Sequence, residues 1–590
     1  MKNIHATIKV LTIAAIWGVC AAVGTIKAQE QLEREMTLER EYDPTVRDAN
    51  KINRLPEIKE PVVSKRPIDY SPFTSPAYPS GEIAALSPGN IHTEILHNKR
   101  RGYFHFGGGM YANLSGDLGY HLIDGEQGKL ALFVTHNSTA GNVKFPEYDN
   151  LRRKAKLNDN LVAADFNHSI GRNAALRIGA SYGYTGFNYY GIPFTTVFSS
   201  VPVENDTETG QINQTVDFNL GISGDNGKFG YTLGADFRHF NQKYGWRKDL
   251  DGIREDRLAP KFDMNFSVGD AGQRIGIAGA ADFFNYRYPS VYNIDDLTGY
   301  RSHVEATVSP YFITGGETWH LRLGANVMLI SGDSLRVFAS PNVSVEAQVA
   351  DRTVFYADAR GEIRSNDAYS LSRLNRYTDH SVAVKPSRTW LDARLGIRSG
   401  IAEGFRTDIF AGFRSTKDAA FFIPTYRAYE NADFASYAAA LQADASLMCA
   451  GAVFMYAFRT LVDISLKGVY NRWTVDDDGH SYTPYADGND GMKPYGLPEA
   501  ELNADVTVKP LAPLALTLDY YLGTGRYTLL LGREVRMKDL HELNFRASWN
   551  FNDNFGAYLK LNNLMFRSQE RMYGYPMQGF HAMAGININF

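Results

Sequence analysis

The chain has very little cysteine, and apart from its N-terminal segment it has no long apolar run. Its 590 residues include 2 cysteines, Cys20 and Cys449. Cys20 lies in a segment that we expect to be removed, so Cys449 would be left alone, without an internal disulfide or a cysteine metal site. No segment approaches the roughly 18 consecutive apolar residues of a membrane-spanning helix, so helical crossing is excluded.

The chain also lacks an excess of charge and any recognisable catalytic motif. Its net charge is -4, and it has no basic block, which argues against nucleic acid as a partner. The 14 histidines are scattered, without a His-Glu-x-x-His pair or metal-ligand spacing, and no Gly-x-Ser-x-Gly turn is present. The sequence therefore predicts no enzyme, no cofactor and no metal site.

Tyrosine, phenylalanine and glycine are abundant. The chain holds 35 Tyr, 34 Phe and 53 Gly, but only 6 Trp. Aromatic residues suit strands and the girdles at two membrane interfaces, and glycines suit the tight turns between hairpins. A chain without spanning helices can still cross a membrane as a closed barrel, in which strands satisfy one another's backbone groups.

The N-terminus resembles an export signal. Lys2 and Lys9 precede an apolar run over residues 10–23, which is too short to span a bilayer comfortably. We predict a signal peptide over residues 1–28, with cleavage after Ala28. A lipid-modified Cys20 is the weaker alternative, because Val19 is larger than the small residue expected before such a cysteine.

Residues 29–100 differ from the rest of the chain. They begin with a charged stretch and hold eight of the 23 prolines, so strands or helices of any length are not expected there. We interpret this segment as an extended periplasmic or lumenal arm. A flexible linker whose role is spacing remains an open alternative.

From residue 101 onward, apolar and polar residues alternate. Leu233, Ala235 and Phe237 fall on one face of a segment, and Asp236 and Arg238 fall on the other. Charged residues in the middle of a strand are tolerable only if their side is a wet interior. Residues 101–590 are therefore predicted to form an all-β fold, a transmembrane antiparallel barrel of about 22 strands, with 20–24 as the range.

The connections between the predicted strands alternate between short and long, as in outer-membrane barrels. The sequence predicts short turns near 124–128, 170–173, 224–227, 271–272, 350–351, 512–513 and 553, and long loops near 139–158, 191–210, 245–258, 366–379, 475–496 and 567–578.

The end of the chain has the form of a final barrel strand. Phe580, Ile586, Ile588 and Phe590 lie among the apolar even positions, whereas the odd positions are small or mostly polar. The barrel-insertion machinery receives its clients with a final strand that ends in an aromatic residue. We therefore assign these four residues to insertion. Outer-membrane lipids and that machinery are the expected partners, and the bacterial outer membrane is the expected location.

In the last hairpin, Asn563-Leu564 closes the penultimate strand, Tyr573 and the stretch from Pro576 to Gly579 lie in the last loop, and the chain ends in Phe590. This hairpin resembles that of TonB-dependent receptors, and the tyrosine-rich composition and the arm resemble receptor-like barrels of the Bacteroidetes. The resemblance implies a receptor-like barrel of 22 strands over residues 101–590. It does not extend to the folded plug domain of that family, because only about 72 proline-rich residues lie between the cleavage site and the first strand.

Two groups of loop residues are candidates for binding. The Asp- and Asn-rich stretch over residues 476–491 offers oxygen ligands for Ca²⁺, although a solvated loop is the preferred interpretation. Tyr482, Tyr485 and Tyr495 in the same loop suit stacking on sugar rings or an aromatic girdle. The same two interpretations apply to the set Tyr184, Phe187, Tyr189 and Tyr190.

Two functions are compatible with these features. The first is a pore or receptor for uptake of a solute across the outer membrane, in which the proline-rich arm could occlude the lumen. The second is a barrel that does not transport, but binds lipoprotein partners in an outer-membrane assembly complex, with the charged stretch over residues 30–54 as the docking element.

Overall fold

A computed structural model describes residues 100–147, 151–192, 210–245, 250–269, 272–287, 300–332, 334–381, 384–428, 434–476 and 492–590. The predicted signal peptide and nearly all of the predicted arm lie outside these ranges, as do Tyr482, Tyr485 and most of the Asp-rich stretch. Among the described residues, no helix is long and apolar enough to cross a membrane.

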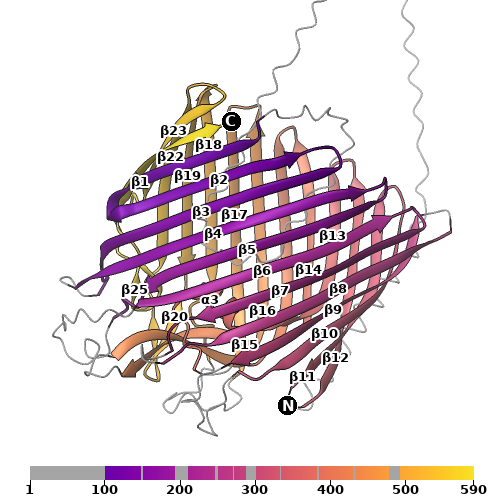
Figure 1. Cartoon of the computed structure of the whole chain (residues 1–590), viewed down its shortest axis with the longest axis horizontal. Helices are drawn as coiled ribbons and strands as arrows, with labels where there is room; N and C mark the ends of the chain where they lie inside the picture. The colour runs from indigo at the N-terminus through magenta and orange to yellow at the C-terminus, as the bar shows by residue number, and fades with distance from the viewer. Residues whose placement is uncertain are drawn as a thin grey trace, which may run out of the picture. The chain divides into compact units, whose positions relative to one another are not determined.

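The described chain forms one closed antiparallel sheet of 22 strands, which confirms the predicted fold class and strand number (Figure 1). Each strand pairs with its neighbours in sequence, and β1 pairs with β26 to close the barrel. The first eleven are β1 (Gly102–Gly109), β2 (Asn113–Asp124), β3 (Gly128–Lys144), β4 (Arg152–Ile170), β5 (Ala174–Asn188), β6 (Gly210–Asp225), β7 (Phe229–Gln242), β8 (Arg254–Val268), β9 (Gln273–Arg287), β10 (His303–Gly315) and β11 (Trp319–Ser331). The others are β12 (Arg336–Ala350), β13 (Thr353–Arg364), β14 (Ser387–Ala402), β15 (Phe405–Ala428), β16 (Phe434–Phe458), β17 (Val462–Asp476), β18 (Ala500–Leu511), β19 (Leu514–Thr524), β22 (Leu540–Asn550), β23 (Phe555–Asn562) and β26 (His581–Asn589).

Short elements lie outside the wall of the barrel. They are η1 (Met110–Ala112), α3 (Ala368–Leu374), the hairpin of β20 (Tyr527–Leu530) and β21 (Arg533–Arg536), and the pair β24 (Glu570–Met572) and β25 (Tyr575–Pro576). All of them lie in connections at the end of the barrel opposite Gly102 and Phe590.

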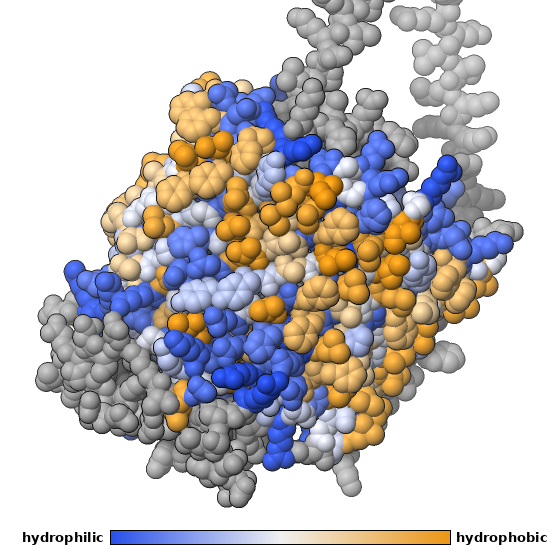
Figure 2. All heavy atoms as spheres, in the orientation of Figure 1, coloured by the Kyte–Doolittle hydropathy of each residue, from blue (hydrophilic) through white to orange (hydrophobic). Residues whose placement is uncertain are grey.

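The outer face of the wall is apolar, as the alternation predicts. Leu233 and Phe237 of β7 are exposed, and Leu258, Phe262 and Phe266 of β8 are exposed beside them. Figure 2 shows apolar residues gathered over the strands on the right of the view, where β8, β9 and β10 lie. Apolar side chains on this face match a hydrocarbon environment, and the closed sheet lets the strands satisfy one another's backbone groups.

The inner face carries charge, and much of that charge is paired between adjacent strands. Each pair joins an Arg or Lys to an Asp at ordinary hydrogen-bond distance. The pairs are Arg238–Asp217 at 2.7 Å, Lys261–Asp236 at 2.7 Å, Arg257–Asp282 at 2.7 Å and Arg414–Asp392 at 2.7 Å. The lumen is therefore polar and suited to water. This agrees with the expectation from the sequence that charged residues in the middle of a strand face a wet interior.

Short and long connections lie at opposite ends of the barrel. Turns such as 226–228, 351–352 and 512–513 lie at the end that holds Gly102 and Phe590, which is the periplasmic end by the usual rule for these barrels. The loop expected over 139–158 is shorter than predicted, because β3 continues to Lys144 and β4 begins at Arg152. These two strands rise above the membrane, where both of their faces can be polar.

The last strand closes the barrel. Gly102 and Phe590 exchange backbone hydrogen bonds of 2.8 and 2.9 Å, and the Phe590 ring stacks on that of Tyr120 at 5.9 Å. Gly107 and Gly585 face each other in this seam, and the Tyr558 ring lies so close that a Cβ on either glycine would clash with it. The four residues assigned to insertion thus lie in or beside the seam, and their role in insertion stays a prediction.

Candidate functional site: the extracellular mouth

The hairpin of β15 and β16 is far longer than the membrane requires. Its strands have 24 and 25 residues, whereas about 10 residues suffice to cross the bilayer. Regular pairing is interrupted between Thr416 and Ala419, and Asp418 there adopts a positive φ of 55°. Beyond this irregularity the hairpin curves across the lower end of the barrel (Figure 1). We call residues 419–425 and 436–443 the crossing hairpin.

Both faces of the crossing hairpin are covered. Ala420, Phe422 and Ala440 pack against one apolar cluster, which is formed by Phe240, Ile253, Tyr300, Ala368, Leu371 and Val384. Phe421 and Leu441 belong to a second cluster on the other face, with Ala445, Val475, Tyr495 and Leu529. Burial of Phe421, Tyr437 and Leu441 alone stabilises this arrangement by on the order of 5 kcal/mol. The crossing hairpin is therefore a packed part of the structure.

Helix α3 fixes the loop next to the crossing hairpin. Asp367 caps the helix by accepting a hydrogen bond from the Ser370 backbone N–H at 2.9 Å. The fully buried Glu255 at the start of β8 accepts a second bond from the Ala368 N–H at 2.7 Å, so the helix is attached to the wall. The same loop continues to Thr378, which forms a parallel bridge with Ala438 of the crossing hairpin.

Five tyrosines from four separate segments meet where the crossing hairpin approaches the other loops. They are Tyr189, Tyr190, Tyr377, Tyr437 and Tyr575, and we call them the tyrosine cluster. The Tyr377 and Tyr575 rings stack at 3.7 Å, and the Tyr189 and Tyr437 rings lie 4.5 Å apart. The Tyr575 hydroxyl donates to the Ser436 carbonyl at 2.5 Å, and the Tyr190 hydroxyl donates to the Pro576 carbonyl at 2.9 Å. Burial raises the pKa of Tyr575 and Tyr190, so both hydroxyls stay protonated.

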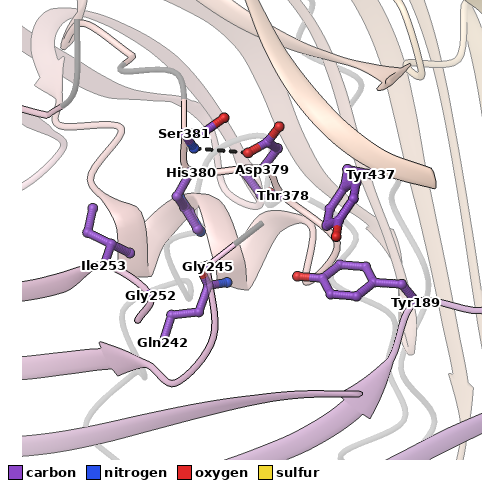
Figure 3. A pocket seen from close by; sticks show the side chains of 10 residues that line it. All are labelled: Tyr189, Gln242, Gly245, Gly252, Ile253, Thr378, Asp379, His380, Ser381 and Tyr437. Atoms are coloured by element: carbon purple, nitrogen blue, oxygen red, sulfur yellow. Dashed lines mark hydrogen bonds between the residues drawn. The ribbon is translucent and has the colours of Figure 1, made fainter. Parts of the chain in front are cut away.

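A crevice lies beside the tyrosine cluster (Figure 3). Its walls come from the crossing hairpin, the loop after α3, and the ends of β5, β7 and β8. The lining residues are Tyr189, Gln242, Gly245, Gly252, Ile253, Thr378, Asp379, His380, Ser381 and Tyr437. Asp379 accepts a hydrogen bond from the Ser381 N–H at 2.9 Å, which shapes the loop around the crevice. A group bound here would touch both the crossing hairpin and the wall.

His380 makes the loop after α3, which contacts the crossing hairpin, sensitive to acid. Its ring bonds the Ser372 hydroxyl at 2.7 Å and approaches the Tyr300 hydroxyl at 3.5 Å. Burial lowers the pKa of His380 to about 4, although Asp379 and Asp367 oppose this shift. The neutral imidazole is therefore the form present in the folded protein. Its contribution to the free energy of unfolding is complete above about pH 6.5, the ordinary pKa of a histidine in an unfolded chain. That stabilisation is lost as the pH falls from about 6.5 to about 4, by up to about 3 kcal/mol.

We therefore expect the amide protection of residues 365–381 to fall between neutral pH and about pH 5, while that of the barrel strands is retained. Hydrogen exchange followed by mass spectrometry measures both regions in one sample. In His380→Gln the pH dependence should disappear, since glutamine does not titrate. An unchanged pH dependence in that variant would assign the effect to another group.

The binding residues predicted from sequence fall in different places. Tyr495 is buried, and its hydroxyl donates to Glu534 at 3.2 Å, so it does not present a face for stacking on a sugar. Tyr189 and Tyr190 belong to the tyrosine cluster rather than to a lipid-facing girdle. Asn563 of the receptor-like hairpin turns the chain with a φ of 52°, and its amide donates to Arg567 and Gln578 carbonyls.

The crossing hairpin was not predicted, although the sequence carries a signal for it. Residues 419–423 and 438–441 are continuous apolar runs without alternation, which is typical of strands buried on both faces. The interpretation of every segment as a wall strand hid this difference. Within the part of the chain that the structure describes, no group of three or more His, Cys, Asp or Glu residues is placed to hold a metal ion.

The closed 22-strand wall, with its apolar outside and charged inside, defines an outer-membrane β-barrel. No protein-family model matches the chain, and no curated protein matches it in sequence. Solved structures match its fold. The siderophore receptor PirA from Acinetobacter baumannii has a TM-score of 0.63 at 11% identity, over 84% of this chain and 81% of that one.

Two receptors from Pseudomonas aeruginosa match similarly. The outer-membrane ferripyoverdine receptor has a TM-score of 0.58 at 13% identity, over 83% of this chain and 72% of that one. A variant of the ferric enterobactin receptor PfeA, solved with enterobactin, has a TM-score of 0.60 at 11% identity, over 83% and 81%. The chain thus has the same barrel fold as these siderophore receptors.

Proposed function

We propose that this protein is a gated receptor for uptake of a solute across the outer membrane. The observation that carries the proposal is a polar, ion-paired lumen beneath a mouth that the chain itself covers. Porins of about 16–18 strands leave an aqueous channel open, whereas outer-membrane transporters of about 22 strands have a plugged lumen. The crevice beside the tyrosine cluster is a small hollow at which one part of a larger ligand would contact the crossing hairpin and the wall together.

Ferric siderophores are the first solutes to test, because the solved structures with this fold include receptors named for them. Aromatic rings and hydroxyl groups line the proposed contact site, and such groups suit a ligand with both flat and polar surfaces. The predicted arm over residues 29–100 would act on the periplasmic side or in the lumen of this passage.

We expect the purified full-length protein to bind a ferric siderophore saturably, as measured by quenching of intrinsic fluorescence with ferric enterobactin and a ferric hydroxamate as probes. Tyr437→Ala should weaken that binding by about ten-fold or more, because it removes an aromatic wall of the crevice. Tyr470→Ala is the matched control, since Tyr470 lies on the outer face of β17 and is 57% exposed.

The alternative is a scaffold barrel that binds lipoprotein partners and transports nothing. The packed mouth is the observation that favours the scaffold, because a permanently closed barrel cannot pass a solute. Purification from solubilised outer membranes, with and without residues 29–100, separates the two functions. Stable lipoprotein partners that are lost with the arm, together with no binding of either probe, would support the scaffold and contradict the receptor.

A further inference from the structure

We propose that the crossing hairpin is a hinged lid, which turns at Lys417-Asp418 and is held shut by the tyrosine cluster. The lid would gate the proposed uptake function. Its movement can be measured without any solute, so the lid and the uptake function can fail separately.

The hinge lies where the ladder between β15 and β16 is interrupted. Thr416 pairs with Ala445 and Ala419 pairs with Ala443, which leaves the two residues between them out of register. Asp418 adopts a φ of 55°, a conformation that residues other than glycine rarely take. A β-bulge of this kind bends a strand locally while the ladders on both sides stay intact.

Polar bonds surround the hinge, in contrast to the apolar packing farther along the hairpin. The Asp418 carboxylate pairs with Arg388 at 2.8 Å, and the Asp418 N–H donates to Asp444 at 2.9 Å. The Gln442 amide donates to the carbonyls of Asp418 and Lys385 at 2.8 and 2.7 Å. Water can take the place of each of these bonds when the hinge turns, whereas it cannot take the place of the apolar packing farther along the hairpin.

The opposite end of the lid is held by a loop from another part of the wall. Ser436 and Tyr437 belong to β16, whereas Tyr575 belongs to the connection between β23 and β26. The Tyr575 hydroxyl bonds the Ser436 carbonyl, and its ring stacks on Tyr377. This contact joins the lid to a segment that the wall separates from β16 by several strands. Breaking it removes one of the contacts that hold the lid shut, without disturbing a wall strand.

The native thiol of Cys449 reports on the lid. Its neighbour Met448 is 60% exposed on the outer face, so the alternation of β16 places Cys449 on the inner face. It lies about 16 Å along the strand from Asp444 toward the periplasmic end. In the part of the chain that the structure describes, the crossing hairpin lies across the opening through which a reagent from outside the cell would reach Cys449.

The experiment measures labelling of Cys449 in intact cells by a maleimide coupled to polyethylene glycol, which is too large for general porins. The full-length wild-type protein should label slowly. Tyr575→Phe loses only the hydroxyl bond and should label roughly five-fold faster, the factor that corresponds to one ordinary hydrogen bond. Tyr575→Ala also loses the stacked ring and should label faster still. A variant with a short Gly-Ser turn in place of residues 420–442 should label at the rate of an open barrel.

Two controls show whether a change in labelling comes from movement of the lid. Tyr470→Ala should label like the wild type, and denatured samples of all variants should label equally. Rapid labelling of the wild type would show that the lid does not close the mouth. Slow labelling of the variant without residues 420–442 would show that another part of the chain blocks the lumen. Equal rates for wild type and Tyr575→Ala would show that the tyrosine cluster does not hold the lid, and any of these three results would overturn the proposal.

Discussion

Replacing Phe590 with Asp should leave the protein in the periplasm, with outer-membrane levels reduced about ten-fold or more. The terminal aromatic is the part of the last strand that we assign to recognition by the insertion machinery. The backbone bonds between Phe590 and Gly102 do not depend on the side chain, so they would survive the substitution. A loss of outer-membrane protein would therefore point to recognition of the side chain rather than to a broken ladder.

Fractionation of cells followed by immunoblotting checks this prediction, and resistance to unfolding in cold detergent shows whether a barrel has formed. Phe590→Tyr is the matched control, because it keeps an aromatic ring beside Tyr120 and should give normal levels. Deletion of Phe590 should behave like the aspartate variant. Normal outer-membrane levels of Phe590→Asp would refute the assignment of this residue.

Replacing Phe421 with Ala should unfold the crossing hairpin while the barrel remains intact. Phe421 is 2% exposed and lies in the cluster between the crossing hairpin and the β20–β21 hairpin. Truncation of a buried phenylalanine costs about 3–5 kcal/mol, because packing is lost and a cavity remains. The backbone bonds that pair the wall strands do not depend on this side chain, although Phe421 also packs against Ala445 and Val475 at the edge of the wall, so the barrel should remain closed.

Limited proteolysis of the purified protein should then cut within residues 419–443 at least ten-fold faster than in the wild type, without loss of the heat-stable barrel. Phe266→Ala is the control. Phe266 is 56% exposed on the outer face of β8, and its truncation should not change the rate of cleavage within residues 419–443. If Phe421→Ala prevented barrel formation altogether, the barrel could not fold without the packed crossing hairpin, and the prediction would be wrong.

The wall of the barrel was predictable because its environment has only two sides. A strand between lipid and water must alternate, so the alternation of Leu233, Asp236 and Arg238 already defined its inner and outer faces. The repeat of short and long connections then gave the number of strands. The terminal strand through Phe590 was predictable for the same reason, and the structure adds its pairing with β1 across the seam.

The mouth was not predictable from these rules. Tyr189, Tyr377 and Tyr575 are far apart in sequence, and their cluster depends on how separate loops fold over the same opening. His380 shows no feature in the sequence that distinguishes it from the other histidines, because its low pKa comes from burial by neighbours that only the fold supplies.

The sequence by itself thus determined the closed, membrane-spanning wall, since alternation is a local pattern that each strand carries alone. The tertiary structure decided that the same wall has a covered mouth. Whether a long hairpin rises into solvent or bends at Asp418 to lie across the lumen depends on contacts with α3, β20 and the Tyr575 loop. Those contacts join residues that are distant along the chain, so no local pattern specifies them.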